Sequence, residues 1–396
     1  MKKYFIGLGL AVLAIQLQAQ PLQRTRPDKV GMDPAKFIYA DEVIHQAIDK
    51  HEIPGAVLAV VRHGKMAYIK AYGNRQVYPD TLQMEESTVF DLASVSKSVS
   101  TAISTLVLIE QGKIRLQDNV SLYIPGFKPW TDAKGNTVNI KVVDLLTHTS
   151  GLPPYASVTE LKATYGAPNP AGLIEYIAGC RRDFAPKTAF QYSCLNYITL
   201  QRIIETASGT NLRAFAKKHI FDVLEMNSTD YLPTGQLRDR CAATEKQPDG
   251  SVLKGDVHDP LARIMNGGIS GNAGVFSTAD DLAILAAALL NGGEYHKKRI
   301  LGPQTVRAMR TVPREVSSLG RTLGWDIFSP YASNTGDLFS SYTYGHTGYT
   351  GTSFIIDPYT DTAVILLTNA VHPADKGSVV RLRSLIANIV AGSIVK

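Results

Sequence analysis

Two strand-pair signals at opposite ends of the chain constrain its fold more than any other feature of the sequence. Near the N-terminus, the apolar or alternating runs 57–62 and 66–72 meet at His63-Gly64, a dipeptide that suits a tight hairpin turn. Near the C-terminus, the runs 352–357 and 362–368 flank a second turn, which begins at Pro358. We therefore expect one antiparallel sheet that is built from both chain ends.

Helical periodicity fills the flanks and the middle of the sequence. A helix should begin at Asp33 as N-cap with Pro34 in its first position, and a closing amphipathic helix should cover 379–390. The middle shows four helical segments separated by long Pro and Gly loops with little strand signal: 95–111, 197–207, 212–224 and 280–291.

These patterns predict an α/β (α+β) fold in which helices flank the antiparallel sheet and a mainly helical region is inserted into it. The sheet region would comprise 21–94 and 275–396, and the helical region 95–274. The two regions should form a single unit with a shared interface. Pockets tend to form at such interfaces, so we expect the functional site there.

The first 20 residues are expected to lie outside this fold. Lys2 and Lys3 precede the apolar run 4–17, and Ala19 precedes a polar stretch, which together are typical of a signal peptide over 1–20. The run is shorter than a bilayer span and no nearby Cys could carry a lipid, so we expect an exported, periplasmic or secreted protein without a transmembrane anchor. The formal net charge of +6 is too mild and too dispersed to indicate nucleic acid as a partner.

The sequence also gives no reason to expect a metal or an organic cofactor. It has no His-Glu-x-x-His and no Cys-x-x-Cys, and the Gly-rich segment 266–274 lacks the Lys-Ser/Thr ending of a phosphate loop. The Gly-x-Ser-x-Gly elbow of α/β-hydrolases is missing as well. The three cysteines, Cys180, Cys194 and Cys241, leave at least one thiol unpaired, and a disulfide between Cys180 and Cys194 remains open.

Ser-x-x-Lys is the motif that could carry chemistry, and it occurs three times where chance predicts on the order of one. The copy at 251–254 follows a turn, and the copy at 393–396 is the last four residues of the sequence. Neither copy is therefore supported by a surrounding secondary-structure pattern. Ser94 and Lys97 instead begin a helix and should lie on one face, one turn apart. A lysine desolvated at a buried helix start is pushed toward its neutral form, which can accept the serine proton. The alternative is a capping serine beside a solvated lysine.

Two further segments favour the chemical interpretation. The segment 190–197, Phe-Gln-Tyr-Ser-Cys-Leu-Asn-Tyr, leads into a helix, and 344–352, Tyr-Gly-His-Thr-Gly-Tyr-Thr-Gly-Thr, leads into a strand. With these motifs the chain resembles the serine β-lactamase and penicillin-binding-protein superfamily in its class C-like branch, from about residue 30 to the C-terminus. The family motifs are Ser-x-x-Lys, Tyr-x-Asn and Lys/His-Thr/Ser-Gly, and the branch includes esterases, D-amino-acid peptidases, muropeptide amidases and acyltransferases.

The resemblance implies a role for each matching residue. Ser94 would be the nucleophile, Lys97 its activating base, and Tyr192 a second base whose proton is coupled to that of Lys97. The backbone N–H groups of Ser94 and Tyr349 would form the oxyanion hole. His346, Thr347 and Gly348 would line the pocket, and His346 and Thr347 would bind a substrate carboxylate or relay protons. Apart from the motifs, Arg381 and Arg383 on the last helix could meet an anionic substrate, while a solvated face is the default expectation for them.

One position departs from the family pattern. Cys194 stands where the second motif usually has Asn, and the literal Tyr-x-Asn at 72–74 lies before the nucleophile, in the wrong order. A thiol is a weaker donor and acceptor than an amide, which disfavours β-lactams and peptides as substrates. Whether Cys194 contacts substrate or only fills the core stays open.

The sequence therefore predicts an exported serine hydrolase or acyltransferase that forms an acyl-enzyme on Ser94. Its partner would be a small ester or amide, a cell-wall fragment or a hydroxylated acceptor, and no cofactor would be needed. A class C-type β-lactamase is one alternative. A penicillin-recognising or wall-binding protein without turnover is another. The true substrate, the choice between hydrolysis and transfer, and the oligomeric state are left open.

Overall fold

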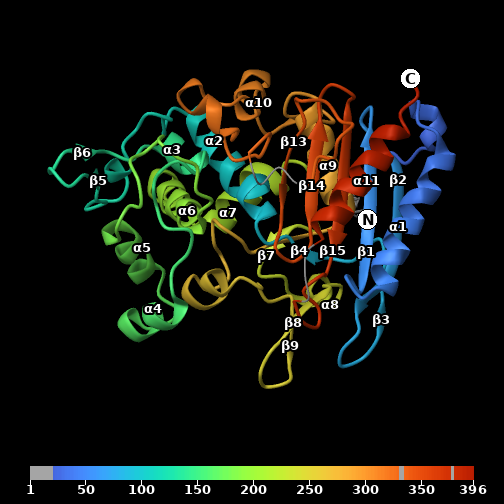
Figure 1. The fold of residues 1–396 in the computed structure, drawn as a ribbon, viewed down its shortest axis with the longest axis horizontal. Coiled ribbons are helices and arrows are strands. Elements are labelled where there is room, and N and C mark those ends of the chain that lie inside the picture. The colour runs from blue at the N-terminus through green and yellow to red at the C-terminus, as the bar shows by residue number, and fades with distance from the viewer. Residues whose placement is uncertain (1–20, 330–333, 376–378) are drawn as a thin grey trace, which may run out of the picture.

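The protein, as a computed structural model, is described over residues 21–329, 334–375 and 379–396, so the predicted signal peptide 1–20 lies outside the described residues. Its main sheet has six antiparallel strands in the order β13-β14-β15-β1-β2-β3 (Figure 1). The bounds are β1 Gly55–Arg62, β2 Lys65–Gln76, β3 Leu82–Gln83, β13 Tyr344–Thr347, β14 Ser353–Asp357 and β15 Thr362–Thr368. The predicted antiparallel sheet from both chain ends is confirmed.

The centre of this sheet is the pairing of β1 with β15. Ala56 lies opposite Thr368 and Arg62 opposite Thr362, so strands from the two ends of the chain are direct neighbours. The turn between β1 and β2 has φ of 49° at His63 and 65° at Gly64. Two successive left-handed residues match the twist of a tight hairpin, which confirms the predicted turn.

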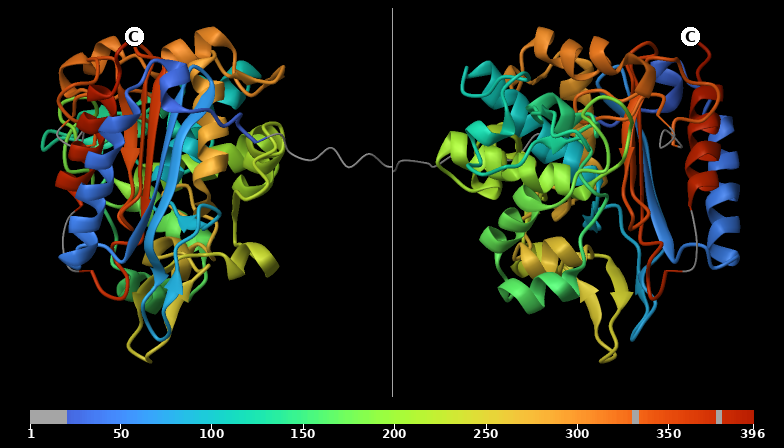
Figure 2. Two further views of the ribbon diagram at one scale, coloured as in Figure 1. Left: turned by 90° about the vertical axis from the view of Figure 1, so that its right-hand side faces the viewer. Right: turned by 60° about the vertical axis from the view of Figure 1, so that its left-hand side comes forward.

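Both faces of the sheet are buried. Along β1, Val57 and Ala59 join one hydrophobic core, while Leu58 and Val60 join another, as the alternation of a strand requires. The second core lies under α1 (Phe37–Asp49) and α11 (Val380–Gly392), which run side by side over one face (Figures 1 and 2). The predicted start at Pro34 is a short 3-10 turn, capped by the Asp33 side chain, before α1 begins.

The first core joins the other face of the sheet to α9 (Ala279–Leu290) and to the helical region (Figure 2). The remaining α-helices are α2 Ile103–Glu110, α3 Val142–Leu146, α4 Val158–Tyr165, α5 Pro170–Gly179, α6 Cys194–Ser208, α7 Leu212–Ala216, α8 Gly235–Asp239 and α10 Pro303–Met309. None of the helices in the described ranges has the length and apolarity that crossing a bilayer requires.

Short strands that the sequence did not indicate lie within the helical region and on both sides of it. A three-stranded sheet has the order β4-β10-β7, with β4 Phe90–Asp91, β7 Asp230–Tyr231 and β10 Val275–Ser277. Three two-stranded ribbons are β5 Trp130–Thr131 with β6 Thr137–Val138, β8 Ala243–Lys246 with β9 Val252–Lys254, and β11 Glu294–Tyr295 with β12 Lys298–Arg299. Strands this short carry too few residues for an alternating pattern to appear in the sequence.

The helix predicted over 95–111 begins as a π-helix, Lys97–Ala102, and continues as α2. Two of its buried hydroxyl side chains donate to distant carbonyls: Ser98 to Gly324 at 2.6 Å and Thr101 to Gly271 at 2.7 Å. These bonds fix the helix between the sheet and the helical region, and therefore fix the side chains at its N-terminal end.

Candidate active site

Ser94 follows a strained residue, Ala93, which lies two residues after the end of β4. Ala93 has a φ of 45°, in the left-handed region that residues with a Cβ seldom adopt. Its N–H donates to the buried Asp91 carboxylate at 2.8 Å, which holds this conformation in place. The bend places Ser94 at the edge of a pocket, where its side chain is partly exposed.

Lys97 is fully buried, and its Nζ lies among three partners. It is 2.9 Å from Ser94 Oγ, 2.8 Å from the carbonyl oxygen of Asn272 and 3.7 Å from Cys194 Sγ. The prediction that Ser94 and Lys97 share one face is confirmed, and the alternative of a solvated lysine is wrong. The lysine head group donates a hydrogen bond directly to the Ser94 hydroxyl.

Tyr192 joins this pair from the segment before α6. The centre of its ring is 5.0 Å from Lys97 Nζ, and burial raises the pKa of its hydroxyl while the proximity of Lys97 and Ser94 lowers it. The His148 ring packs against the Tyr192 ring at 4.5 Å between centres, and His148 Nδ1 accepts from the Ser193 N–H at 3.1 Å. The second motif is thereby held to the loop that precedes α4.

The charges of Lys97 and Tyr192 depend on each other. Burial lowers the pKa of Lys97, but the negative charges that Cys194 and Tyr192 can carry raise it, and its pKa ends above the ordinary value. The expectation of a lysine pushed toward its neutral form is therefore wrong. Burial also raises the pKa of Tyr192, against the attraction of Lys97. When this pair loses a proton, the phenol loses it and the ammonium stabilises the phenolate.

The other two Ser-x-x-Lys motifs have no such arrangement. Ser251 donates to Asp249 at 2.6 Å in an exposed turn, and Ser393 donates to the Val390 carbonyl at 2.6 Å. Neither hydroxyl has a hydrogen bond to the lysine of its motif among the described contacts, so Ser94 is distinguished by geometry as well as by motif order.

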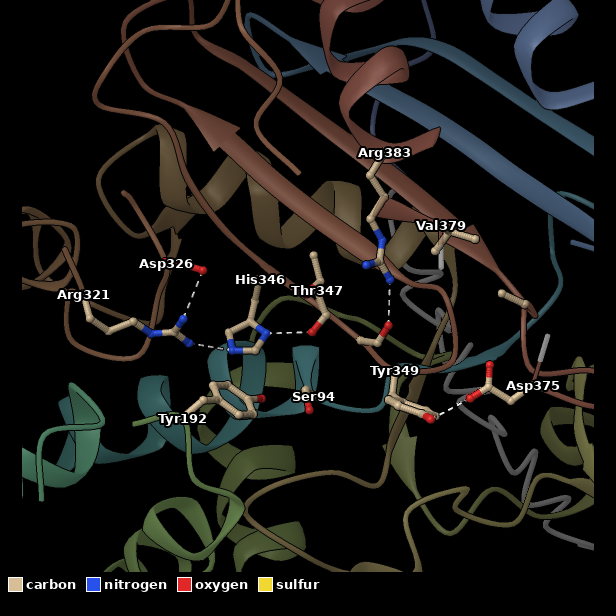
Figure 3. A pocket seen from close by; sticks show the side chains of 12 residues that line it. Ser94, Tyr192, Arg321, Asp326, His346, Thr347, Tyr349, Asp375, Val379 and Arg383 are labelled. Atoms are coloured by element: carbon tan, nitrogen blue, oxygen red, sulfur yellow. Dashed lines mark hydrogen bonds and ion pairs between the residues drawn. The ribbon is translucent and has the colours of Figure 1, made fainter. Parts of the chain in front are cut away.

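His346 lies on β13 between two partners that determine its tautomer (Figure 3). Arg321 Nη2 is 2.7 Å from His346 Nε2, and because a guanidinium can only donate, Nε2 must accept. His346 Nδ1 is 2.8 Å from the carbonyl of Thr347, which can only accept, so Nδ1 must donate. The ring is neutral, and burial together with the charges of Arg321 and Lys97 lowers the pKa of His346 well below its usual range.

Both ring nitrogens of His346 are thus occupied. The predicted role for His346 in proton relay or carboxylate binding stays a prediction, and it would require one of these bonds to break. Arg321 is itself fully buried and also pairs with Asp326 at 3.2 Å (Figure 3). The positive charge at this end of the pocket is therefore carried by Arg321.

Gly348 allows the third motif to approach the nucleophile segment. A Cβ on Gly348 would lie 2.1 Å from Thr352 Oγ1 and 2.4 Å from the Leu92 carbonyl oxygen, so a side chain has no room here. In the described part of the chain, the N–H groups of Ser94 and Tyr349 donate to no internal acceptor. Both are available to a bound ligand.

The site opens into a pocket of about 310 Å³. Its lining residues are Ser94, Tyr192, Arg321, Asp326, His346, Thr347, Gly348, Tyr349, Ala370, Asp375, Val379 and Arg383 (Figure 3). Six of the predicted site residues are among them, and Lys97 and Cys194 are not among the lining residues. Tyr349, with 66% of its surface exposed, forms part of the rim and donates to Asp375 at 2.6 Å.

Sequence reasoning missed Arg321 and misplaced Arg383. Arg381 is exposed as expected, but Arg383 is only 8% exposed, and burial lowers the pKa of its guanidinium to about 10. A signal for Arg383 was present, because it precedes the buried Ile386 and Val390 by three and seven residues on the inner helix face. Arg321 lies in an irregular segment, where no periodicity marks a buried position.

Cysteines and metal ligands add little to the site. Cys180, Cys194 and Cys241 are free thiols, so the disulfide left open between the first two is not formed. Burial raises the pKa of Cys194, although Lys97 opposes this shift. Across the described residues, no group of three or more His, Cys, Asp or Glu side chains is placed to hold a metal ion.

Comparison with known proteins agrees with this geometry. A family model described as Beta-lactamase matches residues 40–388. A protein of Escherichia coli strain K12 named "Putative D-alanyl-D-alanine carboxypeptidase" is 30% identical over 94% of this chain and 92% of its own. An N-acetylmuramyl-L-alanine amidase of Bacillus subtilis strain 168 is 34% identical over 81% of this chain and 78% of its own.

Solved structures show the same fold. EstCE1, a hydrolase with promiscuous acyltransferase activity, matches with a TM-score of 0.73 and 24% identity, over 90% of this chain and 99% of that chain. The family match spans most of the sequence, and the relatives include proteins named as peptidase, amidase and esterase. The chain therefore belongs to the Beta-lactamase family and is a serine hydrolase of that fold.

Proposed function

We propose that the protein cleaves small esters and amides through an acyl-enzyme on Ser94, outside the cytoplasm. The observation that carries this proposal is the 2.9 Å contact between Lys97 Nζ and Ser94 Oγ, in a site that Tyr192 completes. Export rests on the sequence of the first 20 residues. The substrate class rests on the site and on the activities for which the relatives are named.

The first step transfers the Ser94 proton to Tyr192. Lys97 holds its own proton tightly and stabilises the phenolate of Tyr192, so the phenolate is the base in this pair. Ser94 Oγ attacks the substrate carbonyl and forms a tetrahedral intermediate. The proton returns to the leaving alcohol or amine as its bond to carbon breaks, which leaves the acyl group on Ser94.

The N–H groups of Ser94 and Tyr349 would donate to the oxygen of the tetrahedral intermediate. Preorganised donors that act on charge developing in the transition state raise the rate of the chemical step. The close approach of Gly348 to Leu92 keeps the two donors in one neighbourhood. A water or an alcohol then takes the acyl group from Ser94 by the reverse proton movements.

Two of the relatives are named for amide bonds of the bacterial cell wall, one at D-alanyl-D-alanine and one at muramyl-L-alanine. We place wall-derived amides among the candidate natural substrates for this reason. EstCE1, a hydrolase with promiscuous acyltransferase activity, favours simple esters as a second class. The thiol of Cys194 is compatible with esters, which are activated already and need less help from an amide contact.

The test is intact mass spectrometry of the full chain after exposure to a fluorophosphonate, to p-nitrophenyl esters, to a D-Ala-D-Ala peptide and to a cephalosporin. We expect one fluorophosphonate adduct at Ser94, an acyl adduct from at least one ester, and loss of both in Ser94→Ala. Ser251→Ala is the matched control because it removes the serine of another Ser-x-x-Lys motif, and it should label normally. Labelling of Ser251 or Ser393 in the wild type would contradict the assignment.

A further inference from the structure

Arg383 is a buried cation without an acidic partner among the described residues. It forms no ion pair within the described ranges, and its Nε has no hydrogen-bond partner there. Its Nη2 instead donates to the carbonyl oxygen of Gly348 at 2.7 Å and to that of Thr352 at 3.1 Å. Burying a charged group on neutral acceptors is costly, so the position calls for a physical reason.

The carbonyl of Gly348 belongs to the same peptide group as the N–H of Tyr349. In a trans peptide the C=O and N–H bonds lie in one plane and point in opposite directions. The Gly351 N–H also donates to the Gly348 carbonyl, at 3.1 Å, so two donors fix the orientation of this plane. Holding the Gly348 carbonyl therefore determines where the Tyr349 N–H points.

A guanidinium does more than a neutral donor at this place. Hydrogen bonds from a charged donor are about twice as strong as neutral ones, and a cation at the carbonyl polarises the whole peptide group. The Tyr349 N–H becomes a better donor as a result. The effect is largest in a buried environment, where only 8% of Arg383 is exposed.

We propose that Arg383 is a positioning residue for the oxyanion hole: through the Gly348 carbonyl it orients and strengthens the N–H of Tyr349. The inference rests on the proposed function, since it assigns the Tyr349 N–H to the tetrahedral intermediate. Arg383 itself does not touch the reacting atoms in this assignment. Its contribution belongs to the transition state, so it should appear in kcat and leave KM nearly unchanged.

The experiment compares Arg383→Met and Arg383→Lys with wild type on a matched pair of neutral substrates, a p-nitrophenyl ester and its thiono analogue, in which sulfur replaces the carbonyl oxygen. Sulfur accepts hydrogen bonds poorly, so the ratio of oxo to thiono rates reports the strength of the oxyanion donors. Arg381→Met, on the exposed side of the same helix, is the control.

We expect Arg383→Met to lower kcat for the oxo ester by about 10- to 100-fold, with KM within about twofold and the thiono rate little changed, because one oxyanion donor is worth about 100- to 1,000-fold. The oxo-to-thiono ratio should then fall by about tenfold or more. Arg383→Lys keeps a charged donor and should recover part of the loss, while Arg381→Met should behave as wild type.

Three outcomes would overturn the proposal. An unchanged oxo-to-thiono ratio, with both rates falling as the melting temperature falls, would assign Arg383 to the fold. A rise in KM confined to substrates that bear a carboxylate would assign it to direct substrate binding. Absence of the fluorophosphonate adduct at Ser94 in wild type would contradict the proposed function and this inference together, whereas a normal adduct with an unchanged ratio contradicts the inference alone.

Discussion

The Thr352 hydroxyl donates to the backbone carbonyl of Leu92 at 3.0 Å, two residues before the nucleophile. Thr350 does the same to the carbonyl of Asp91 at 2.7 Å. The two side chains fasten the turn after β13 to the segment that carries Ser94. The third motif and the first motif are therefore parts of one hydrogen-bonded unit, although most of the chain separates them in the sequence.

Thr352→Val removes one of these bonds with little change of shape. We expect it to lower the free energy of unfolding by about 0.5–1.5 kcal/mol, the net contribution of one hydrogen bond, because the Leu92 carbonyl still accepts from the Val95 N–H. The kcat should fall by about tenfold while KM changes little, because the N–H groups of Ser94 and Tyr349 are no longer held in the correct relative position. Chemical denaturation and steady-state kinetics measure the two effects. Thr137→Val in the exposed β6 is the control, and a Thr352→Val enzyme with full kcat would refute the coupling.

Arg321→Met removes the donor that holds His346 in one tautomer, so we expect the ring of the variant to be no longer restricted to that tautomer. Burial lowers the pKa of His346, and the charges of Arg321, Lys97 and Arg383 lower it further. Tyr192 lies nearby, with 6.0 Å between the ring centres. Removing one of these charges raises the pKa of His346, so the ring becomes protonated at higher pH than in wild type.

Nitrogen-15 NMR of labelled histidine checks this directly. Wild type should show a neutral His346 with the proton on Nδ1 from about pH 5 to about pH 9, and the variant should titrate within or closer to that window. The double variant Arg321→Met, Asp326→Asn avoids an unpaired buried carboxylate and should titrate in the same way. An identical tautomer in wild type and both variants would show that Arg321 does not set it.

The coupled pair of Lys97 and Tyr192 predicts how activity changes with pH. Because burial raises the pKa of Tyr192, the phenolate forms as pH increases, and kcat/KM should rise from neutral toward alkaline pH. Lys97→Met removes the attraction that opposes this shift, so the rise should move to still higher pH and the loss should be larger at pH 7 than at pH 10.

Since Lys97 and Tyr192 form one unit, Lys97→Met and Tyr192→Phe should be non-additive, with the double variant about as slow as the slower single variant. The pH profiles of all three are the measurement. Additive losses of activity would argue for separate roles. So would a Lys97→Met pH profile that has the shape of the wild-type profile and only lower rates.

Cys194→Asn tests the effect of having Cys where the second motif of the family usually has Asn. The thiol lies 3.7 Å from Lys97 Nζ, and an amide oxygen there could accept a stronger hydrogen bond from Lys97 while its NH2 group faces a substrate amide. We expect the rate on a cephalosporin or a D-Ala-D-Ala peptide to rise by about tenfold relative to a short-chain ester, the equivalent of one good hydrogen bond. Cys194→Ser keeps a small side chain and is the control. If wild type already hydrolyses cephalosporins rapidly and ignores esters, Cys194 serves only in packing.

Asp281 predicts a pH effect on stability. Burial raises the pKa of this carboxyl to about 6, although Oδ2 accepts from the Ser228 N–H at 2.8 Å and from Thr229 Oγ1 at 2.7 Å. The folded state therefore binds its proton more tightly than the unfolded state. The Asp281 contribution to stability falls as pH rises from about 4 to about 6 and stays lost above that range.

Asp281→Asn can keep both bonds with its carbonyl oxygen and has no charge to bury. Relative to wild type it should gain up to about 3 kcal/mol between pH 4 and pH 8, at 1.36 kcal/mol per pKa unit. Urea denaturation of both proteins at the two pH values measures this difference. If the difference in free energy of unfolding between the two proteins is the same at both pH values, Asp281 is ionised throughout the range.

The sequence was most informative where local chemistry decides the structure. The hairpin at His63 and Gly64 and the outer helices were predictable from turn preference and periodicity. The partner of β1 was less specified, because register between distant strands is set by two buried faces rather than by any local pattern. The π-helix at Lys97 was not predicted, since its buried hydroxyls find acceptors that the sequence does not reveal.

In the site, motif order was sufficient to bring Ser94, Lys97 and Tyr192 together. The pKa of Lys97 was misjudged because desolvation was weighed without the opposing charges that Cys194 and Tyr192 can carry. Arg321 could not have been found from spacing, since it reaches His346 from an irregular segment. These errors share one cause: the electrostatics of a buried site depend on all of its neighbours at once.

The pairing of β1 with β15 also limits the stage of synthesis at which the sheet, and with it the active site, can fold. Contacts between residues so far apart along the chain form late and slowly, because a long loop must close before they are gained. During synthesis, β1 leaves the ribosome well before β15, so one edge of β1 stays unpaired until β15 follows. Catalytic competence is therefore expected only after β15 has been synthesised, and a chain stopped before Thr362 would expose the edge of β1 to aggregation.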